Sequence, residues 1–139
     1  MASERKVVAQ KVLDHLNTWP EKPVNFELED LDKYPIAMMM QQLAGKTQEK
    51  KFVNGTKIVS WPFAIFVRVQ ANANNSKISA ISLLNELDEW LADTELPELG
   101  DDREAQKFEM TALPSLAGTY DNGTQDYQAV FSLTYKEKG

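Results

Sequence analysis

The chain has 139 residues and a formal net charge of −6, with 42% hydrophobic and 26% charged residues. A chain of this length and composition is typical of one globular domain with a core of its own, so we expect a single domain over residues 1–139. There are no cysteines, which excludes disulfides, thiolate catalysis and cysteine-based metal sites. The negative charge argues against sequence-specific binding to nucleic acid, whose phosphates it repels.

The first predicted helix covers residues 4 to 18, where Val8, Val12 and Leu16 recur at helical spacing. Charged residues interrupt this stretch at every turn, which is not the pattern of a secretion signal. No run of the sequence approaches the roughly 18 apolar residues of a membrane span. We therefore expect the protein to be made and kept in a cytoplasm.

Two short elements are predicted next. "VNFEL", residues 24 to 28, alternates apolar and polar side chains and predicts a half-buried strand. "IAMMMQQLAG" suits a buried strand or a short helix equally well by periodicity, and its length between Pro35 and Gly45 favours a strand over residues 36 to 43.

Asn54-Gly55, between two apolar runs, predicts a β-hairpin with a type I′ turn. Its second arm, residues 57 to 70, contains Pro62, which cannot donate a ladder hydrogen bond. A bulge, a bend or a sheet edge is expected there. After Pro62, apolar residues at every second position predict a central strand with one fully buried face.

The most regular helical stripe predicts a helix over residues 77 to 92, with Asn75 or Ser76 as its N-cap. An exposed acidic connection follows, and alternating residues predict two last strands, around residues 108–112 and 127–135. Between them, "LPSLAGTYDNGTQDYQ" is interpreted as a long connection with Asn122-Gly123 as its tight turn. This order predicts an α+β fold (α/β layer): a mainly antiparallel mixed sheet with two main helices packed on one face.

The sequence contains no P-loop, no G-x-G-x-x-G after a strand and no G-x-S-x-G. The single histidine, His15, is expected to have a surface or packing role. Solvated faces and turns explain the remaining acidic groups better than acid–base catalysis or a cation site does; these are Glu27, Glu29, Asp30, Asp32, Asp101 and Asp102. We therefore predict no enzyme, with no catalytic residue, cofactor or metal.

The charges are distributed unevenly. Residues 46 to 57 contain four lysines and one acid, Glu49, whereas residues 86 to 104 contain nine acids and one basic residue, Arg103. A closed ring of identical subunits needs a contact between two different surfaces, and patches of opposite sign suit such a contact. We hypothesise that the basic hairpin approaches the acidic segment of the next subunit; two unrelated solvated faces are the alternative.

Tyr120 and Tyr127, each an apolar ring with a polar tip, suit a protein contact beside the long connection. With these two tyrosines, the candidate subunit or partner interface consists of Lys46, Lys50, Lys51, Lys57, Trp61, Asp93, Glu95, Glu98, Asp101, Asp102, Tyr120, Asp121, Asn122 and Tyr127.

Four stretches together carry a resemblance to a known family: "KPVNFELEDLDKYPIAMMMQQLAG", "KFVNGTKIVSWPFAIFVRV", "LLNELDEWL" and "MTALPSLAGTYDNGTQDYQAVFSLTYK". They resemble the minor capsid proteins of tailed phages and prophages of Gram-positive bacteria, which are similar to tail terminators, also called tail-completion proteins. The resemblance covers nearly the whole chain and rests on the order of its elements, not on a short catalytic motif.

The resemblance implies a non-enzymatic virion protein of the tail or neck, assembled in the host cytoplasm. It implies a ring, typically a hexamer, on the head-proximal end of a long tail, where it stops tube polymerisation and joins the head connector. The partners would then be further copies of itself, the tail-tube protein and the connector, with DNA only passing through the lumen. A net charge of −6 is compatible with a lumen that repels DNA. A head-completion or connector protein, an intracellular protein-binding adaptor and a small-molecule enzyme are the competing interpretations.

Overall fold

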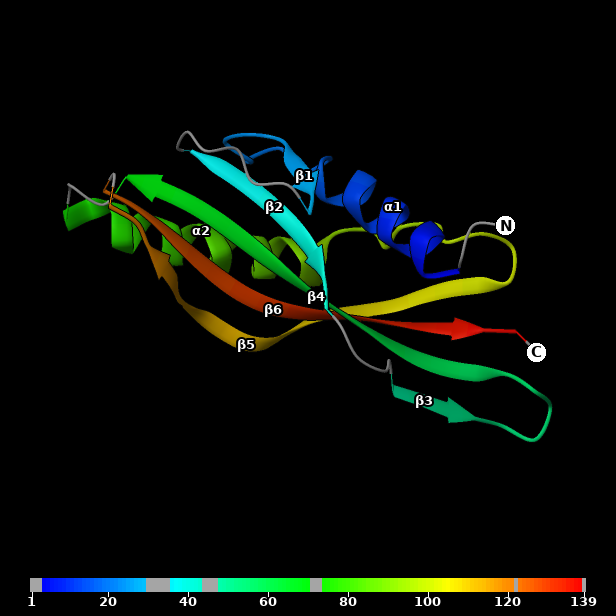
Figure 1. Cartoon of the computed structure of the whole chain (residues 1–139). Helices are drawn as coiled ribbons and strands as arrows, with labels where there is room; N and C mark the ends of the chain where they lie inside the picture. The colour runs from blue at the N-terminus through cyan, green and yellow to red at the C-terminus, as the bar shows by residue number, and fades with distance from the viewer. Residues whose placement is uncertain (1–3, 30–35, 44–47, 71–73, 122, 139) are drawn as a thin grey trace.

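The computed structural model describes residues 4–29, 36–43, 48–70, 74–121 and 123–138 (Figure 1). Within these ranges the chain forms two helices and six strands: α1 (Glu4–Leu16), β1 (Phe26–Leu28), β2 (Ala37–Gln42), β3 (Gln48–Lys51), β4 (Lys57–Gln70), α2 (Asn74–Asp93), β5 (Arg103–Thr119) and β6 (Thr124–Glu137). The predicted α+β class is confirmed. Neither helix is long and apolar enough, in the described part of the chain, to cross a membrane.

The six strands form one mixed sheet in the order β1-β2-β4-β6-β5, with β3 paired to the first part of β4. Only the β1–β2 pair is parallel among these strands, so the predicted mainly antiparallel sheet is confirmed. Residues 36 to 43 contain strand β2, so the predicted strand is confirmed and the alternative of a short helix is wrong. The predicted turn "EDLDKYP" lies mostly outside the described residues.

The core lies between one face of the sheet and the two helices. β4 and β6 bury every second residue on this face, and their alternation matches the sequence pattern: Phe63, Ile65, Val67 and Val69 on β4, and Tyr127, Ala129, Phe131, Leu133 and Tyr135 on β6. Val12 and Leu16 of α1 and Leu84 and Leu87 of α2 join the same cluster. Burial of these side chains is the main force that holds helices and sheet together.

Pro62 lies where the neighbour of β4 changes. β3 pairs with β4 up to Ser60, and β2 pairs with it from Phe63 onward. On the other side, the ladder with β6 continues through Pro62 without a register shift. Of the three predicted alternatives, the described strands therefore show a local edge.

Both hairpin turns have the same hydrogen-bond pattern. In the β3–β4 hairpin the Gly55 N–H donates to the Phe52 carbonyl (2.9 Å), and the Phe52 N–H donates to the Thr56 carbonyl (2.8 Å). Gly55 has a φ of 88°, and Asn54 is not among the positive-φ residues of the described chain. The predicted hairpin is confirmed, but the predicted type I′ turn is wrong: this is a three-residue loop with glycine in the left-handed region.

The prediction of a long connection after residue 112 is also wrong, because β5 continues to Thr119. Four register shifts against β6 each insert one extra residue into β5. Such bulges let Pro114 and Gly118 lie within a strand that, in the described sheet, pairs on one side only. The connection to β6 is thereby reduced to a tight turn around Gly123, whose φ is 85°.

Helix α2 begins at Asn74, three residues before the predicted start. Asn75 and Ser76 therefore lie within its first turn, and the prediction that one of them is the N-cap is wrong. The residues before Asn74 lie outside the described ranges. The apolar stripe of this helix was predicted from its three- and four-residue spacing, and Ala80, Leu84, Leu87 and Leu91 are buried as expected.

Candidate interaction site

The basic hairpin and the acidic connection lie at the same end of the sheet. At this end Lys57 of β4 is opposite Glu137 of β6, which in turn is opposite Arg103 of β5. The strands run in the order β3-β4-β6-β5 across it. Glu98 of the connection forms an isolated bridge with Glu104 of β5, so the connection adjoins the β5 edge. Figure 1 shows the hairpin, the end of β6 and the connection together at the right.

We call the β3 side the basic edge, defined by Lys50, Lys51 and Lys57. Lys50 and Lys51 are exposed and Lys57 is half-buried. Lys46, the fourth predicted lysine, lies outside the described residues. Lys50 and Lys51 lie on β3, a short strand that pairs only with β4 among the described strands, and Lys57 lies opposite Lys51 on β4. Such ammonium groups can attract an acidic partner and keep other basic surfaces away.

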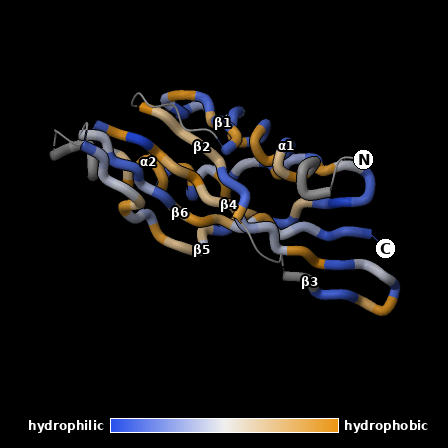
Figure 2. The backbone as a smooth tube through the Cα atoms, viewed as in Figure 1, coloured by the Kyte–Doolittle hydropathy of each residue, from blue (hydrophilic) through white to orange (hydrophobic). Residues whose placement is uncertain are grey.

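The tip of the same hairpin contains hydrophobic residues, as the orange stretch at the end of the β3–β4 loop in Figure 2 shows. Phe52 is 46% exposed and Val53 109% exposed. Both line a groove of about 580 Å³ that also includes Ile58 of β4 and Lys136 of β6. The Lys50 Nζ lies 5.7 Å from the centroid of the Phe52 ring. The basic edge therefore combines charge with accessible apolar surface.

We call the residues on the β5 side the acidic edge, defined by Asp93, Glu95, Glu98, Asp101 and Asp102. All five side chains are exposed. Leu99, which is fully buried, anchors the connection to the core, and the Lys138 N–H donates to the Asp102 carbonyl (2.9 Å). The carboxylates are therefore carried by a backbone that is tied to the sheet at two points.

Not all of these acids present uncompensated charge. Asp101 and Asp102 surround a hollow of about 100 Å³ together with Lys136 and Lys138. Glu95 and Glu98 do not line that hollow. Asp93 lies instead beside a second groove, of about 430 Å³, which contains Trp90 and Glu89. Glu98 lines a separate hollow with Arg103 and Glu104. Neither Glu95 nor Glu98 shares a hollow with a lysine among the described residues, and both are exposed toward a basic partner.

The predicted residues around Tyr120 lie at the other end of the sheet, where Gln70 of β4 is opposite Thr124 of β6. Asp121 is exposed there, and Asn122 lies outside the described residues. The structure therefore does not bring this group together with the basic and acidic edges. The predicted interface residues that the structure describes therefore do not form one surface.

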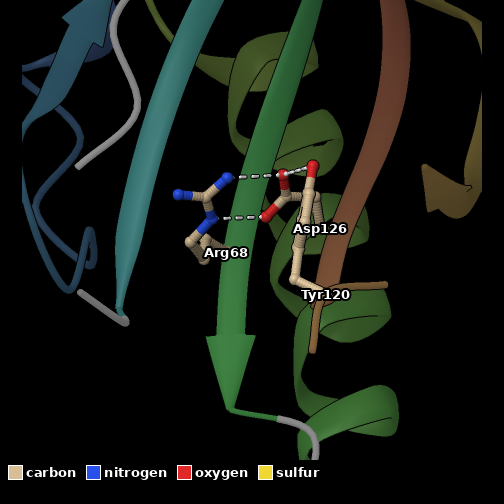
Figure 3. A network of polar contacts seen from close by, with 3 residues as sticks. All are labelled: Arg68, Tyr120 and Asp126. Carbon is tan, nitrogen blue, oxygen red and sulfur yellow. Dashed lines mark hydrogen bonds and ion pairs between the residues drawn. The ribbon is translucent and has the colours of Figure 1, made fainter. Parts of the chain in front are cut away.

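Tyr120 belongs to a polar network that Figure 3 shows in detail. Arg68 Nε and Nη2 donate to the two carboxylate oxygens of Asp126 at 2.7 and 3.0 Å, and the Tyr120 hydroxyl donates to Asp126 Oδ2 at 2.9 Å. The Arg68 guanidinium also lies over the Tyr120 ring, 5.1 Å from its centroid. The hydrogen bonding of Arg68 to the Asp126 carboxylate raises the pKa of Arg68 above its ordinary value. The network fastens the β5–β6 turn to β4.

Two predicted interface residues lie in the core. Trp61 and Tyr127 are each 2% exposed. Trp61 packs against Phe63, with ring centroids 5.4 Å apart, and the Tyr127 hydroxyl donates to Gln125 Oε1 at 3.2 Å. Their prediction as surface contacts is wrong, because both occupy inward-facing positions of the alternation in β4 and β6.

His15 has the predicted packing role. Its ring stacks between Trp90 of α2 and Phe108 of β5, with centroid distances of 5.1 and 5.7 Å. Its Nε2 is buried and has no hydrogen-bond partner among the described residues. Burial lowers the pKa of His15 below its ordinary value of 6.5. The ring of His15 therefore packs like an apolar aromatic side chain between α2 and the sheet, and it holds α1 against both.

Other sites considered in the sequence remain without support. In the described ranges no three acidic or imidazole groups come together in a way that could hold a metal ion. Glu27 and Glu29 are exposed on and after β1, while Asp30 and Asp32 lie outside the described residues. Sequence reasoning missed the groove at the hairpin tip, although Phe52-Val53 directly before Asn54-Gly55 was a signal: two apolar residues at the tip of a turn.

The chain matches no protein-family model and no curated protein sequence.

Proposed function

We propose that the protein is a structural subunit that assembles head to tail into a closed ring, and that this ring is a tail terminator of a long-tailed phage or prophage. The observation that carries the proposal is the placement of a basic and an acidic edge at opposite sides of the same sheet end. A ring requires that one surface of a subunit meets a different surface of its neighbour, and the two edges supply such a pair.

The geometry favours contact between copies over contact within one chain. β4, β6 and β5 separate the basic edge from the acidic connection, and adjacent strands lie about 4.8 Å apart. Three strand spacings place β3 roughly 14 Å from β5. Lys50 and Lys51 are exposed on β3, three strand spacings from the β5 side that carries Glu95 and Glu98, where they can guide a neighbouring subunit into register.

The role on a phage tail comes from the resemblance of the sequence to minor capsid and tail-terminator proteins. In that role the ring binds the last ring of tail-tube protein, stops polymerisation and offers its other side to the head connector. DNA passes through the lumen, where a protein of net charge −6 has little attraction for phosphates.

Polymerisation of the cognate tail-tube protein in the presence of this chain tests the role. We expect tubes that carry a ring at one end and are shorter than tubes grown alone, as measured by electron microscopy. The matched control is the Lys50→Glu, Lys51→Glu variant, which should leave tube length unchanged because it cannot close the ring. Tubes of unaltered length and without rings would contradict the terminator role. Rings that bind purified connector but not tubes would assign the chain to the connector.

A further inference from the structure

The hairpin tip has features of a receptor for an apolar side chain. Its groove is lined by Phe52, Val53, Thr56, Ile58, Gln106 and Lys136, which come from the turn and from three strands. The groove measures about 580 Å³, and two of its apolar residues, Phe52 and Val53, are among the exposed large hydrophobic side chains of the described chain. Exposed apolar side chains gathered in a groove mark a contact surface more often than scattered ones do.

The charges around this groove select the kind of partner. Lys50 lies beside the Phe52 ring on the same sheet face as Ile58, and Lys136 belongs to the lining, with Glu104 opposite it on β5. An occupant that matches this rim has an apolar side chain with carboxylates next to it. A basic or purely polar occupant would leave the ammonium groups facing like charge or the apolar lining uncovered.

The acidic edge contains such a side chain. Leu96 is 39% exposed and stands between Glu95 and Glu98, both exposed. Burial of Leu99 and the bridge between Glu98 and Glu104 hold this short stretch against the β5 side of the sheet. Leu96 is thus presented on a fixed backbone, which lowers the entropy that a contact must overcome.

We propose that Leu96 of one subunit inserts into the hairpin groove of the next subunit, with Glu95 and Glu98 beside Lys50 and Lys136. This inference rests on the proposed head-to-tail ring and names the apolar anchor of its contact. In β4 and β6 the groove residues Ile58 and Lys136 alternate with the buried Val59 and Tyr135, so the groove opens on the sheet face away from the core, whereas Leu96 lies in the connection that follows α2. Contact through both surfaces therefore propagates from subunit to subunit.

Burial of the Leu96 side chain contributes to the binding free energy in a way that salt does not screen, unlike the attraction between charges. Removing the Leu96 side chain beyond Cβ should weaken association on the order of 30-fold, because apolar area then stays in water. Leu113, which is 78% exposed on β5, supplies the matched control: Leu113→Ala removes the same atoms outside the proposed contact. Equal dissociation constants for Leu96→Ala and Leu113→Ala, measured by sedimentation in high salt, would overturn the anchor.

Disulfide cross-linking identifies the neighbours directly, because the natural chain has no cysteine. We expect the double variant Val53→Cys, Leu96→Cys to give a ladder of covalent oligomers after oxidation, and the variant Val53→Cys, Leu113→Cys to give none. Strong dimers from Val53→Cys alone would mean that two hairpins meet each other, which contradicts the inference.

The outcomes separate this inference from the proposed function. If the wild-type chain forms oligomers by light scattering but the Val53→Cys, Leu96→Cys variant gives no covalent ladder, the Leu96 contact is contradicted and the proposed ring is not. A wild-type chain that stays monomeric at all concentrations, with no ladder, would overturn both.

Discussion

At the scale of single residues, Asp126 of β6 joins β4 and the β5–β6 turn through its carboxylate. Its carboxylate accepts both donors of Arg68 and the hydroxyl of Tyr120, and its side chain is almost entirely buried. Bidentate pairs of this kind are stronger than ordinary hydrogen bonds, and removing one partner leaves the other charge buried without compensation. The network therefore acts on stability and on the position of the β5–β6 turn.

Asp126→Ala should lower the free energy of unfolding by about 3 kcal/mol, since it leaves Arg68 and the Tyr120 hydroxyl without this acceptor. Urea denaturation measures the loss. Asp121→Ala is the matched control in the same turn, and because Asp121 is exposed its loss should stay within about 0.5 kcal/mol. Equal losses for the two variants would show that the network contributes nothing specific.

His15 predicts a pH dependence of stability. Because burial lowers its pKa in the folded state, the unfolded chain takes up the proton first as the pH falls below 6.5. Stability should thus be highest above pH 6.5 and decrease as the pH falls from 6.5 through the folded-state pKa. His15→Phe keeps an aromatic ring between Trp90 and Phe108 and should remove this decrease. Urea midpoints at pH 7.5 and 5.5 check it; an identical decrease in the variant would contradict the assignment to His15.

At the scale of elements, the sequence predicted strands and helices well where the period is regular. β4, β6 and α2 keep one unbroken alternation or stripe over most of their length, and the apolar residues of that pattern are the ones buried, among them Phe63, Phe131 and Leu84. β5 was recognised only in its first part, because each inserted residue shifts the alternation to the other face. The period-two pattern therefore breaks between Met110 and Ala112, which is exposed, while the strand continues.

The sequence predicted where the two tight turns lie but not the turn type of the β3–β4 hairpin. Asn-Gly marked both hairpins, yet only the glycine takes a positive φ in the described β3–β4 turn. The pattern of hydrogen bonds depends on how the two strands pair beyond the turn, which the dipeptide alone does not encode.

Gly123→Ala should lower the free energy of unfolding by about 1–2 kcal/mol, because a left-handed backbone is costly for alanine. An added Cβ would also lie 2.8 Å from Gln70 Nε2, which donates to the Gly123 carbonyl at 3.2 Å. Thermal or urea unfolding measures the loss. Gly123→Asn meets the same neighbour but tolerates the backbone better, so its loss should be smaller; equal losses would mean that the backbone angle is not the cause.

At the scale of the whole molecule, the sequence predicted the sign of the charged segments but not their placement. That Lys50 and Glu95 lie at opposite sides of one sheet end follows from the order of β3, β4, β6 and β5, which depends on long-range pairing. Trp61 and Tyr127 were assigned to a surface because aromatic residues are frequent in interfaces. The same side chains fill cores, and only their register in the sheet distinguishes the two roles.

The central claim is that the basic edge of one copy meets the acidic edge of the next. Two complementary variants test it most directly: Lys50→Glu, Lys51→Glu and Glu95→Lys, Glu98→Lys. Their masses are measured by light scattering, alone and as an equimolar mixture. Each variant alone should remain monomeric at concentrations where the wild-type chain forms rings, because like charges then face each other. The mixture should recover the mass of the wild-type ring, since each altered edge finds an opposite one. A mixture that stays monomeric while the wild-type chain assembles would contradict the claim.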